Sequence, residues 1–314
     1  MERADEKRFR ILVCIDGSDE SYRGLRYAAR LGRGVDADIC LLYVRPVDQA
    51  LRSGGLQARV VRENLLEWGL ELPGTKHLMK GRDILTELGL MSDEWGQKMI
   101  HVDKLGDPLG DNSIEYSSAN GKKVTLKLEV APDIVGGILE ECEEGQYDLL
   151  IIGASERWNS GSYKTFWDPA VAQKVVKHAH CSVIVARELE SGHGHLICTD
   201  GTDNAIDVAR KDAILAARCN CPVSLITVVP EDMEEAEAAD ILSRTRAAIE
   251  EEGLEVVESL LRTGDPVKEI ADAGADYSVI VIGRSKKRRK WWLFETDISD
   301  QILERATNSV MIVR

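Results

Sequence analysis

The sequence has no apolar stretch that approaches the length of a membrane span, and this absence argues against a transmembrane helix. Its first ten residues lack the apolar region of a signal peptide, so we expect a cytoplasmic protein. Basic side chains are scarce: 40 Lys and Arg stand against 54 Asp and Glu, a formal net charge of −14. Phosphate contacts need a basic face, so this balance argues against nucleic acid as a partner.

Cysteine is too sparse for a disulfide framework. There are seven cysteines in 314 residues, an odd number, and Cys14, Cys40 and Cys198 lie inside apolar runs typical of strands. A reduced compartment fits this usage, with the thiols acting as small apolar groups. Cys219 and Cys221 form a close pair, but no second Cys or His pair has matching spacing. We therefore expect no metal site.

An internal repeat is the most informative feature that is present. RILVCIDGSDES at residues 10–21 returns as HLICTDGTDNAI at residues 195–206, and SVIVAR at residues 182–187 returns as SVMIVR at residues 309–314. A repeat unit of this size is a duplicated domain, since solenoid repeats are much shorter. We predict a first domain over residues 1–190 and a second over residues 191–314.

Short apolar runs alternate with amphipathic helical patterns in both halves. This alternation predicts an α/β fold with two doubly wound, mainly parallel sheets of Rossmann-like type. The first domain carries two insertions, at about residues 48–76 and 91–121, and Asn120-Gly121 predicts a type I′ hairpin turn in the second. The alternating run at residues 124–130 is typical of an edge or half-exposed strand. The hairpin has two interpretations, a cover for a sheet edge or a docking surface for a protein partner.

These motifs resemble the universal stress protein family, in the ILVCIDGSDES opening, the IIG and VIG strand ends and the closing HAHCSVIVAR. The resemblance implies a tandem universal stress protein, a non-enzymatic binding protein or regulator in the stress response. It also implies that the two domains are related by an internal pseudo-two-fold axis. The last strands would pair across it, residues 183–186 against residues 310–313. The expected assembly is a monomeric pseudo-dimer or a homodimer.

Nucleotide-binding members of the family use an Asp at the end of the first strand and a Val at the end of the second. A G-x2-G-x9-G-[S/T] segment then holds the phosphates. The resemblance therefore implies an adenine nucleotide, ATP or AMP, with no metal of the protein's own. The Asp-Gly-Ser and Asp-Gly-Thr segments have a second interpretation, in which they only fix a turn and cap a helix. The candidate residues are Asp16, Gly17, Ser18, Val44 and Gly153 in the first half, and Asp200, Gly201, Thr202, Val228, Gly283, Lys286 and Thr296 in the second.

Both halves depart from the phosphate motif. In the first, Glu156 replaces the second glycine, and Pro169-Ala170 stands where Gly-Ser is expected after a loop three residues longer. The second half keeps the spacing but places Lys286 and Thr296 at these positions. A glutamate repels phosphate and a proline offers no backbone N–H, so we expect any nucleotide in the second half.

A basic loop replaces the lost glycines of the second half. Residues 285–292 contain five basic residues and two tryptophans. This loop is open to four interpretations: a solvated loop, an unusual phosphate pocket, a site for an acidic protein partner or a contact with an anionic membrane surface. Two other functions compete with a nucleotide-binding regulator. One is a ligand-independent interaction module; the other is a weak nucleotide hydrolase, because DGSDES loosely resembles the SGGxDS loop of ATP pyrophosphatases. No nucleophile–base–acid set recurs among the six histidines, so we expect no enzyme.

Overall fold

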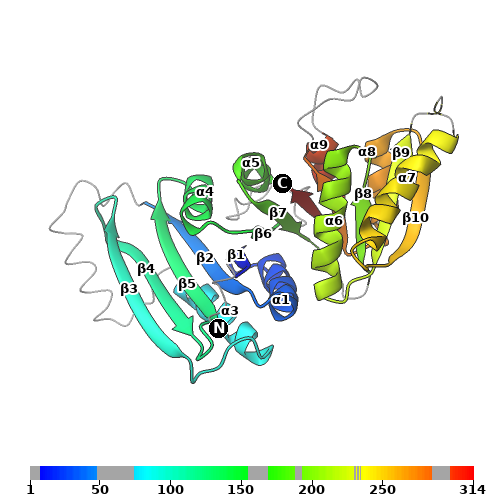
Figure 1. The fold of residues 1–314 in the computed structure, drawn as a ribbon. Coiled ribbons are helices and arrows are strands. Elements are labelled where there is room, and N and C mark those ends of the chain that lie inside the picture. The colour runs from blue at the N-terminus through cyan, green and yellow to red at the C-terminus, as the bar shows by residue number, and fades with distance from the viewer. Residues whose placement is uncertain are drawn as a thin grey trace. The chain divides into compact units, whose positions relative to one another are not determined.

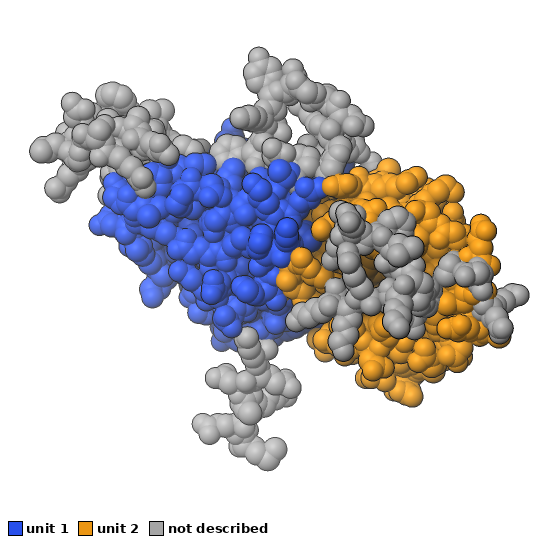
Figure 2. All heavy atoms as spheres, turned by 90° about the horizontal axis from the view of Figure 1, so that it is seen from above, with its two compact units in different colours: residues 1–180 blue, residues 181–314 orange. Residues whose placement is uncertain are grey.

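The computed structural model describes residues 8–47, 74–154, 169–187, 193–229, 231, 233, 235–284 and 298–314. The chain divides into two compact units, residues 1–180 and residues 181–314, which Figure 2 colours separately. Each unit is an α/β structure built on one sheet (Figure 1). The predicted fold class is confirmed.

Four parallel strands form the centre of the first unit, in the order β6-β1-β2-β5. Their apolar runs are buried because helices cover both faces of the sheet, α4 and α5 on one side and α1 and α3 on the other (Figure 1). The bounds are β1 (Arg10–Cys14), α1 (Asp19–Gly34), β2 (Asp38–Pro46), α3 (Thr75–Glu87), β5 (Lys123–Ala131), α4 (Ile134–Gly145), β6 (Leu149–Gly153) and α5 (Pro169–His178).

A β-hairpin extends this sheet beyond β5. Its strands are β3 (Gly96–Lys104) and β4 (Asp107–Ser117), and β4 runs antiparallel to both β3 and β5. The hairpin therefore covers the edge of the parallel sheet. This agrees with the first of its two interpretations, a cover for a sheet edge. Of the two interpretations of residues 124–130, the edge strand is wrong because β4 occupies that edge, whereas the half-exposed strand holds. The alternation has another cause: Leu126 and Leu128 are buried on one face, while Lys127 lies half-buried on the other.

The predicted type I′ turn lies at a different place. Such a turn needs positive φ at both central residues. Leu105 and Gly106, between β3 and β4, have φ of 57° and 69°. At the predicted position only Gly121 has positive φ, 80°. The β4–β5 register pairs Ser117 with Lys123, which leaves a longer loop than a two-residue turn can close.

The second unit repeats the plan, with the strand order β10-β9-β8-β11-β12-β7. All neighbouring strands are parallel except the last pair, β12 and β7. The bounds are β7 (Ser182–Ala186), β8 (His195–Cys198), α6 (Asp203–Arg218), β9 (Val223–Val229), α7 (Glu235–Glu250), β10 (Val256–Thr263), α8 (Pro266–Gly274), β11 (Val279–Gly283), α9 (Ile298–Arg305) and β12 (Ser309–Val313).

The last strand of the first repeat thus belongs to the sheet of the second unit. Ile184 lies opposite Met311 in the antiparallel β7–β12 pair. The hydrogen bonds that flank the pair are reciprocal between equivalent residues: the Arg187 N–H donates to Ser309 Oγ at 2.9 Å and the Arg314 N–H to Ser182 Oγ at 3.4 Å. The predicted pairing of the two last strands is confirmed.

Candidate functional site

The segment Asp16-Gly17-Ser18 forms a hydrogen-bonded turn between β1 and α1. The Asp16 Oδ1 atom accepts from the Ser18 N–H at 2.9 Å and from the Ser18 hydroxyl at 2.5 Å. Ser18 is the N-cap of α1, and its hydroxyl oxygen accepts from the Ser21 N–H at 3.1 Å. Gly17 has φ of 89°, a conformation that side chains rarely adopt. The local sequence therefore suffices to build this turn.

The segment Asp200-Gly201-Thr202 builds the same turn between β8 and α6. Asp200 Oδ1 accepts from the Thr202 N–H at 3.0 Å and from the Thr202 hydroxyl at 2.6 Å. Thr202 caps α6 by accepting from the Ala205 N–H at 3.3 Å, and Gly201 has φ of 73°. The turn-and-cap interpretation thus holds in both halves. It does not exclude a ligand, because each turn lies at the carboxyl end of a parallel strand.

Strand register brings the candidate residues of the second unit together. Cys198 on β8 pairs with Ile226 on β9, and Ile197 pairs with Val281 on β11. Two residues further along, this register sets Asp200 level with Val228. It sets Gly283 level with Thr199, one residue before Asp200. The chain runs outward from β8 to β9 and β10, and then crosses back to β11 on the other side of β8. The strand order therefore reverses between β8 and β11, and α/β folds bind ligands at such a switch point.

The first unit has the same register. Cys14 on β1 pairs with Leu42 on β2, and Val13 pairs with Ile151 on β6. Asp16, Val44 and Gly153 therefore take the places that Asp200, Val228 and Gly283 take in the second unit. Sequence reasoning chose the same residue types in both halves, and the structure places each set at the ends of three adjacent strands.

Close helix packing provides a structural reason for two of the glycines. A Cβ at Gly153 would lie 2.7 Å from the Ser21 backbone nitrogen, and a Cβ at Gly283 would lie 2.9 Å from a Val208 side-chain carbon. Because α1 and α6 approach so closely at these points, a side chain at either position would force a neighbouring group to shift. Glycine here does not by itself indicate a phosphate.

The helix that follows the second strand distinguishes the two sites. In the first unit, α3 places the His77 ring so that a Cβ at Gly17 would be 2.3 Å from it, and the same ring stacks on Tyr43 with 6.0 Å between centroids. In the second unit, α7 places Arg244 there instead, and its guanidinium donates to the Gly201 carbonyl at 3.2 Å. Arg284 follows Gly283 directly in the sequence.

Part of the predicted phosphate segment lies outside the described residues, namely Glu156 in the first half and Lys286, Thr296 and the basic loop at 285–292 in the second. Pro169 is described as the first residue of α5. Proline is well suited to that position, because the first turn of a helix leaves its N–H groups without partners inside the helix.

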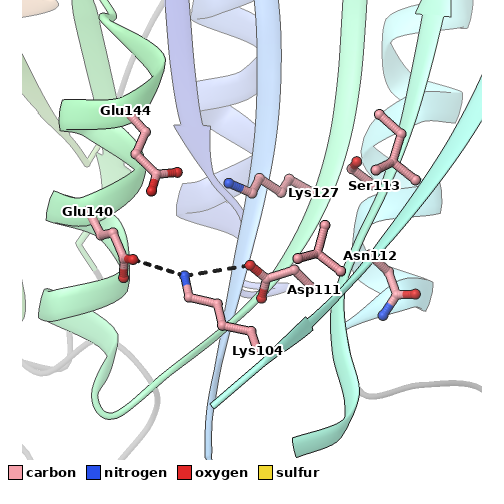
Figure 3. Close-up of a pocket in the computed structure, with 9 residues that line it drawn as sticks. Lys104, Asp111, Asn112, Ser113, Lys127, Glu140 and Glu144 are labelled. Carbon is pink, nitrogen blue, oxygen red and sulfur yellow. Dashed lines mark ion pairs between the residues drawn. The ribbon is translucent and has the colours of Figure 1, made fainter. Parts of the chain in front are cut away.

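A cavity of about 390 Å³ lies between the hairpin and α4 (Figure 3). Lys104 points between Asp111 and Glu140, with Nζ to carboxylate distances of 3.5 Å and 3.2 Å, and also contacts Glu129 at 3.0 Å. These ion pairs join β3, β4, β5 and α4. The cavity is lined by Ile100, Val102, Lys104, Asp111, Asn112, Ser113, Lys127, Glu140 and Glu144.

Glu129 is the most perturbed carboxylate of this region. Its side chain is fully buried, and burial raises its pKa to about 7, although Lys127 and Lys104 act in the opposite direction. For Lys104, burial lowers the pKa, but Glu129, Glu140 and Asp111 together raise it above its usual value. The cluster is a charge network that attaches the hairpin to the domain, and no motif in the sequence indicated it.

A second cluster that the sequence analysis did not identify lies in the second unit. His195 and Asp212 are fully buried and form an ion pair at 2.9 Å, and His195 also hydrogen-bonds Cys221. These residues are far apart in sequence and only the fold unites them. Among the described residues, no group of three or more His, Cys, Asp or Glu has the arrangement of a metal site.

Comparison with known proteins agrees with this architecture. A model of the Universal stress protein family matches residues 7–187 and, a second time, residues 195–314. Universal stress protein MJ0531 of Methanocaldococcus jannaschii is 26% identical over 185 residues, which cover 57% of this chain and 82% of that protein.

Two solved structures of nearly full length share the fold. A universal stress protein from Archaeoglobus fulgidus DSM 4304 is 16% identical, with a TM-score of 0.58, covering 97% of this chain and 96% of that one. A putative universal stress protein from Pseudomonas aeruginosa UCBPP-PA14 is 15% identical, with a TM-score of 0.56, covering 98% and 93%. The chain belongs to the universal stress protein family and contains two copies of its domain. Across the described ranges, no helix has the length and apolar character needed to cross a membrane.

Proposed function

We propose that this chain is a non-enzymatic, cytoplasmic binding protein of the stress response whose second domain binds AMP or ATP. The observation that carries the proposal is the strand register, which groups Asp200, Val228 and Gly283 at the switch point of the second sheet. The adenine nucleotide is the ligand that the family resemblance implies for an Asp and a Val at these positions. Crevices at such switch points are where doubly wound folds bind nucleotides.

The chemistry of the residues indicates where the ribose, the adenine and the phosphates would each lie in the site. The Asp200 carboxylate suits ribose hydroxyls, which donate hydrogen bonds to it. Val228 supplies an apolar surface for the adenine. The phosphates would lie toward Gly283, with Arg284 supplying positive charge. Arg244 lies beside Gly201 and is already paired with Asp240 at 2.9 Å.

The first domain is the weaker candidate. The first turn of α1 carries two acidic residues, Asp19 and Glu20, whereas that of α6 carries one, Asp203. The residue after Gly153 is Ala154 rather than an arginine. Glu156 adds a further negative charge to the segment that would meet phosphate. A polyphosphate therefore finds less electrostatic compensation in the first domain than in the second.

Isothermal titration of the full chain with AMP and ATP tests the proposal. Asp200→Asn removes the charge but keeps an oxygen to accept from Thr202, so the turn is retained. We expect this variant to weaken AMP binding by about tenfold or more, the range for losing hydrogen bonds to a charged group. The matched variant Asp16→Asn, in the equivalent turn of the first domain, should bind as the wild type does.

The phosphate end needs its own variant. Arg284→Met should weaken AMP and ATP but leave the affinity for adenosine unchanged. Absence of heat with either nucleotide would refute nucleotide binding and favour the interaction-module function. Binding that survives Asp200→Asn but is lost in Asp16→Asn would place the ligand in the first domain.

The exposed edge of β3 favours a second candidate function, an interaction module that binds by strand addition. Met99 is 70% exposed and Val102 is 53% exposed, and β3 is the outer strand of the hairpin. Antiparallel pairing of two β3 strands about Ile100 would set Lys98 opposite Val102, so no like charges meet. A second copy of this chain is therefore a fitting partner.

Sedimentation equilibrium of the nucleotide-free protein tests this candidate. We expect a reversible dimer that Val102→Lys abolishes, because the new charge would face Lys98 of the second copy. Val257→Lys is the matched control, since Val257 is also an exposed strand valine, 64% exposed on β10. A protein that is monomeric at every concentration, or a dimer that both variants leave intact, would exclude pairing through β3.

A further inference from the structure

The second unit contains a chain of three interacting side chains at the end of the sheet opposite to the Asp200 turn. His195 is the first residue of β8, Asp212 lies on α6, and Cys221 precedes β9. His195 Nδ1 lies 2.9 Å from Asp212 Oδ2, and both side chains are fully buried. The imidazole is also hydrogen-bonded to the Cys221 side chain.

The buried carboxylate requires a charged imidazole. Among the described residues, Asp212 Oδ1 has no hydrogen-bond partner, so His195 is the group that compensates the Asp212 charge. A buried carboxylate without a charged partner is strongly destabilising. Burial alone lowers the pKa of His195, but Asp212, with a smaller effect of Cys221, raises it to about 10. His195 is therefore an imidazolium at neutral pH.

An imidazolium donates from both ring nitrogens. Since Nδ1 faces Asp212, the other nitrogen is the donor to the Cys221 sulfur. A neighbouring imidazolium lowers the pKa of a thiol and so favours the thiolate, the nucleophilic form. Cys221 also donates to the Cys219 carbonyl, but over the long distance of 3.8 Å.

Cys219 is a natural internal comparison. It lies two residues away and has intermediate exposure, as Cys221 does, whereas the other five cysteines are buried. The Cys219 thiol donates to the Leu215 and Ala216 carbonyls at 3.2 Å and 3.4 Å. A thiol that donates its proton to carbonyls at a helix end is stabilised in the protonated form.

We propose that Cys221 is a reactive thiolate, paired with His195 and positioned through it by Asp212, and that it is a site of oxidation by hydroperoxides. The chemistry needs no nucleotide and is independent of the function proposed above. The chain would carry it in one domain only, because β1, which begins with Arg10, contains no histidine, whereas β8 begins with His195.

The oxidation balances within this cluster. The Cys221 sulfur attacks one oxygen of hydrogen peroxide, so that an S–O bond forms as the O–O bond breaks. The departing hydroxide takes the proton of the His195 imidazolium and leaves as water. The products are the sulfenic acid of Cys221 and a neutral His195, and a thiol reductant would later return the sulfur to its starting state.

Alkylation rates of two single variants test the proposal. Cys219→Ser leaves Cys221 and Cys221→Ser leaves Cys219, with the same buried cysteines in both. At pH 7 we expect iodoacetamide to modify Cys221 about tenfold faster than Cys219, followed by intact mass, because few ordinary thiols are ionised there. Between pH 6 and pH 8 the Cys221 rate should stay nearly constant, whereas the Cys219 rate should rise with pH.

Peroxide supplies the second measurement. After treatment with hydrogen peroxide, dimedone should label Cys221 in Cys219→Ser and give no adduct at Cys219 in Cys221→Ser. Asp212→Asn, confirmed as folded by circular dichroism, should restore an ordinary pH-dependent rate at Cys221. Equal alkylation rates for the two cysteines, or a Cys221 rate that rises with pH as that of Cys219 does, would overturn the proposal.

Discussion

Glu129 should make the stability of the first domain fall as the pH rises. Its carboxylate is fully buried, and its pKa of about 7 lies above the ordinary 4.5 because burial disfavours the charge. A carboxyl whose pKa is raised by folding is neutral in both states below pH 4.5 and charged in both above about pH 7. The folded state therefore loses stability across this window, by about 1.4 kcal/mol per unit of pKa difference, or roughly 3 kcal/mol in all.

Glu129→Gln removes this titration while retaining the shape of the side chain. Both lysines keep other partners, since Lys104 contacts Glu140 at 3.2 Å and Lys127 pairs with Glu141. We expect the variant to gain roughly 2 kcal/mol on the wild type between pH 5 and pH 8. Most of the window lies within that range.

Urea unfolding of both proteins at pH 5, 6, 7 and 8 measures the difference in free energy of unfolding. The second domain is common to both, so its contribution cancels. Glu140→Gln is the matched control: Glu140 contacts the same Lys104 but is 43% exposed, and its substitution should show no such trend. A difference between wild type and Glu129→Gln that stays constant with pH would refute the reasoning.

Two further predictions concern the second unit, each measured by urea unfolding. Thr202→Ala removes the cap of α6 and should lower the free energy of unfolding by about 1 kcal/mol, whereas Thr202→Ser should leave it nearly unchanged. Equal losses in the two variants would show that the hydroxyl does not stabilise the helix. Arg187→Met leaves the Ala306 and Asn308 carbonyls, which accept from the guanidinium at 2.7 Å and 3.2 Å, without that donor, and should cost about 3 kcal/mol. Arg187→Lys should cost less, and a loss below that of an exposed substitution would contradict a stabilising role for these two hydrogen bonds.

Local features were predictable from the sequence because their interactions span few residues. Ser18 and Thr202 were expected as helix caps, and each receives its hydrogen bond from a residue three positions later. The duplicated strands followed from short apolar runs, and the pairing of the last strands from the family resemblance. The hairpin was also foreseen, although its type I′ turn lies at Leu105-Gly106 rather than at Asn120-Gly121.

Tertiary structure alone decided which distant residues interact and in what ionisation state. Strand register sets Asp200 level with Val228, and no property of either segment by itself fixes that alignment. His195, Asp212 and Cys221 meet because α6 packs on β8 and the turn before β9 returns beside it. Burial there holds a histidine charged, while on β5 it raises the pKa of Glu129. Desolvation and neighbouring charges cause both pKa shifts. Both depend on how distant segments pack together, which no local stretch of sequence determines.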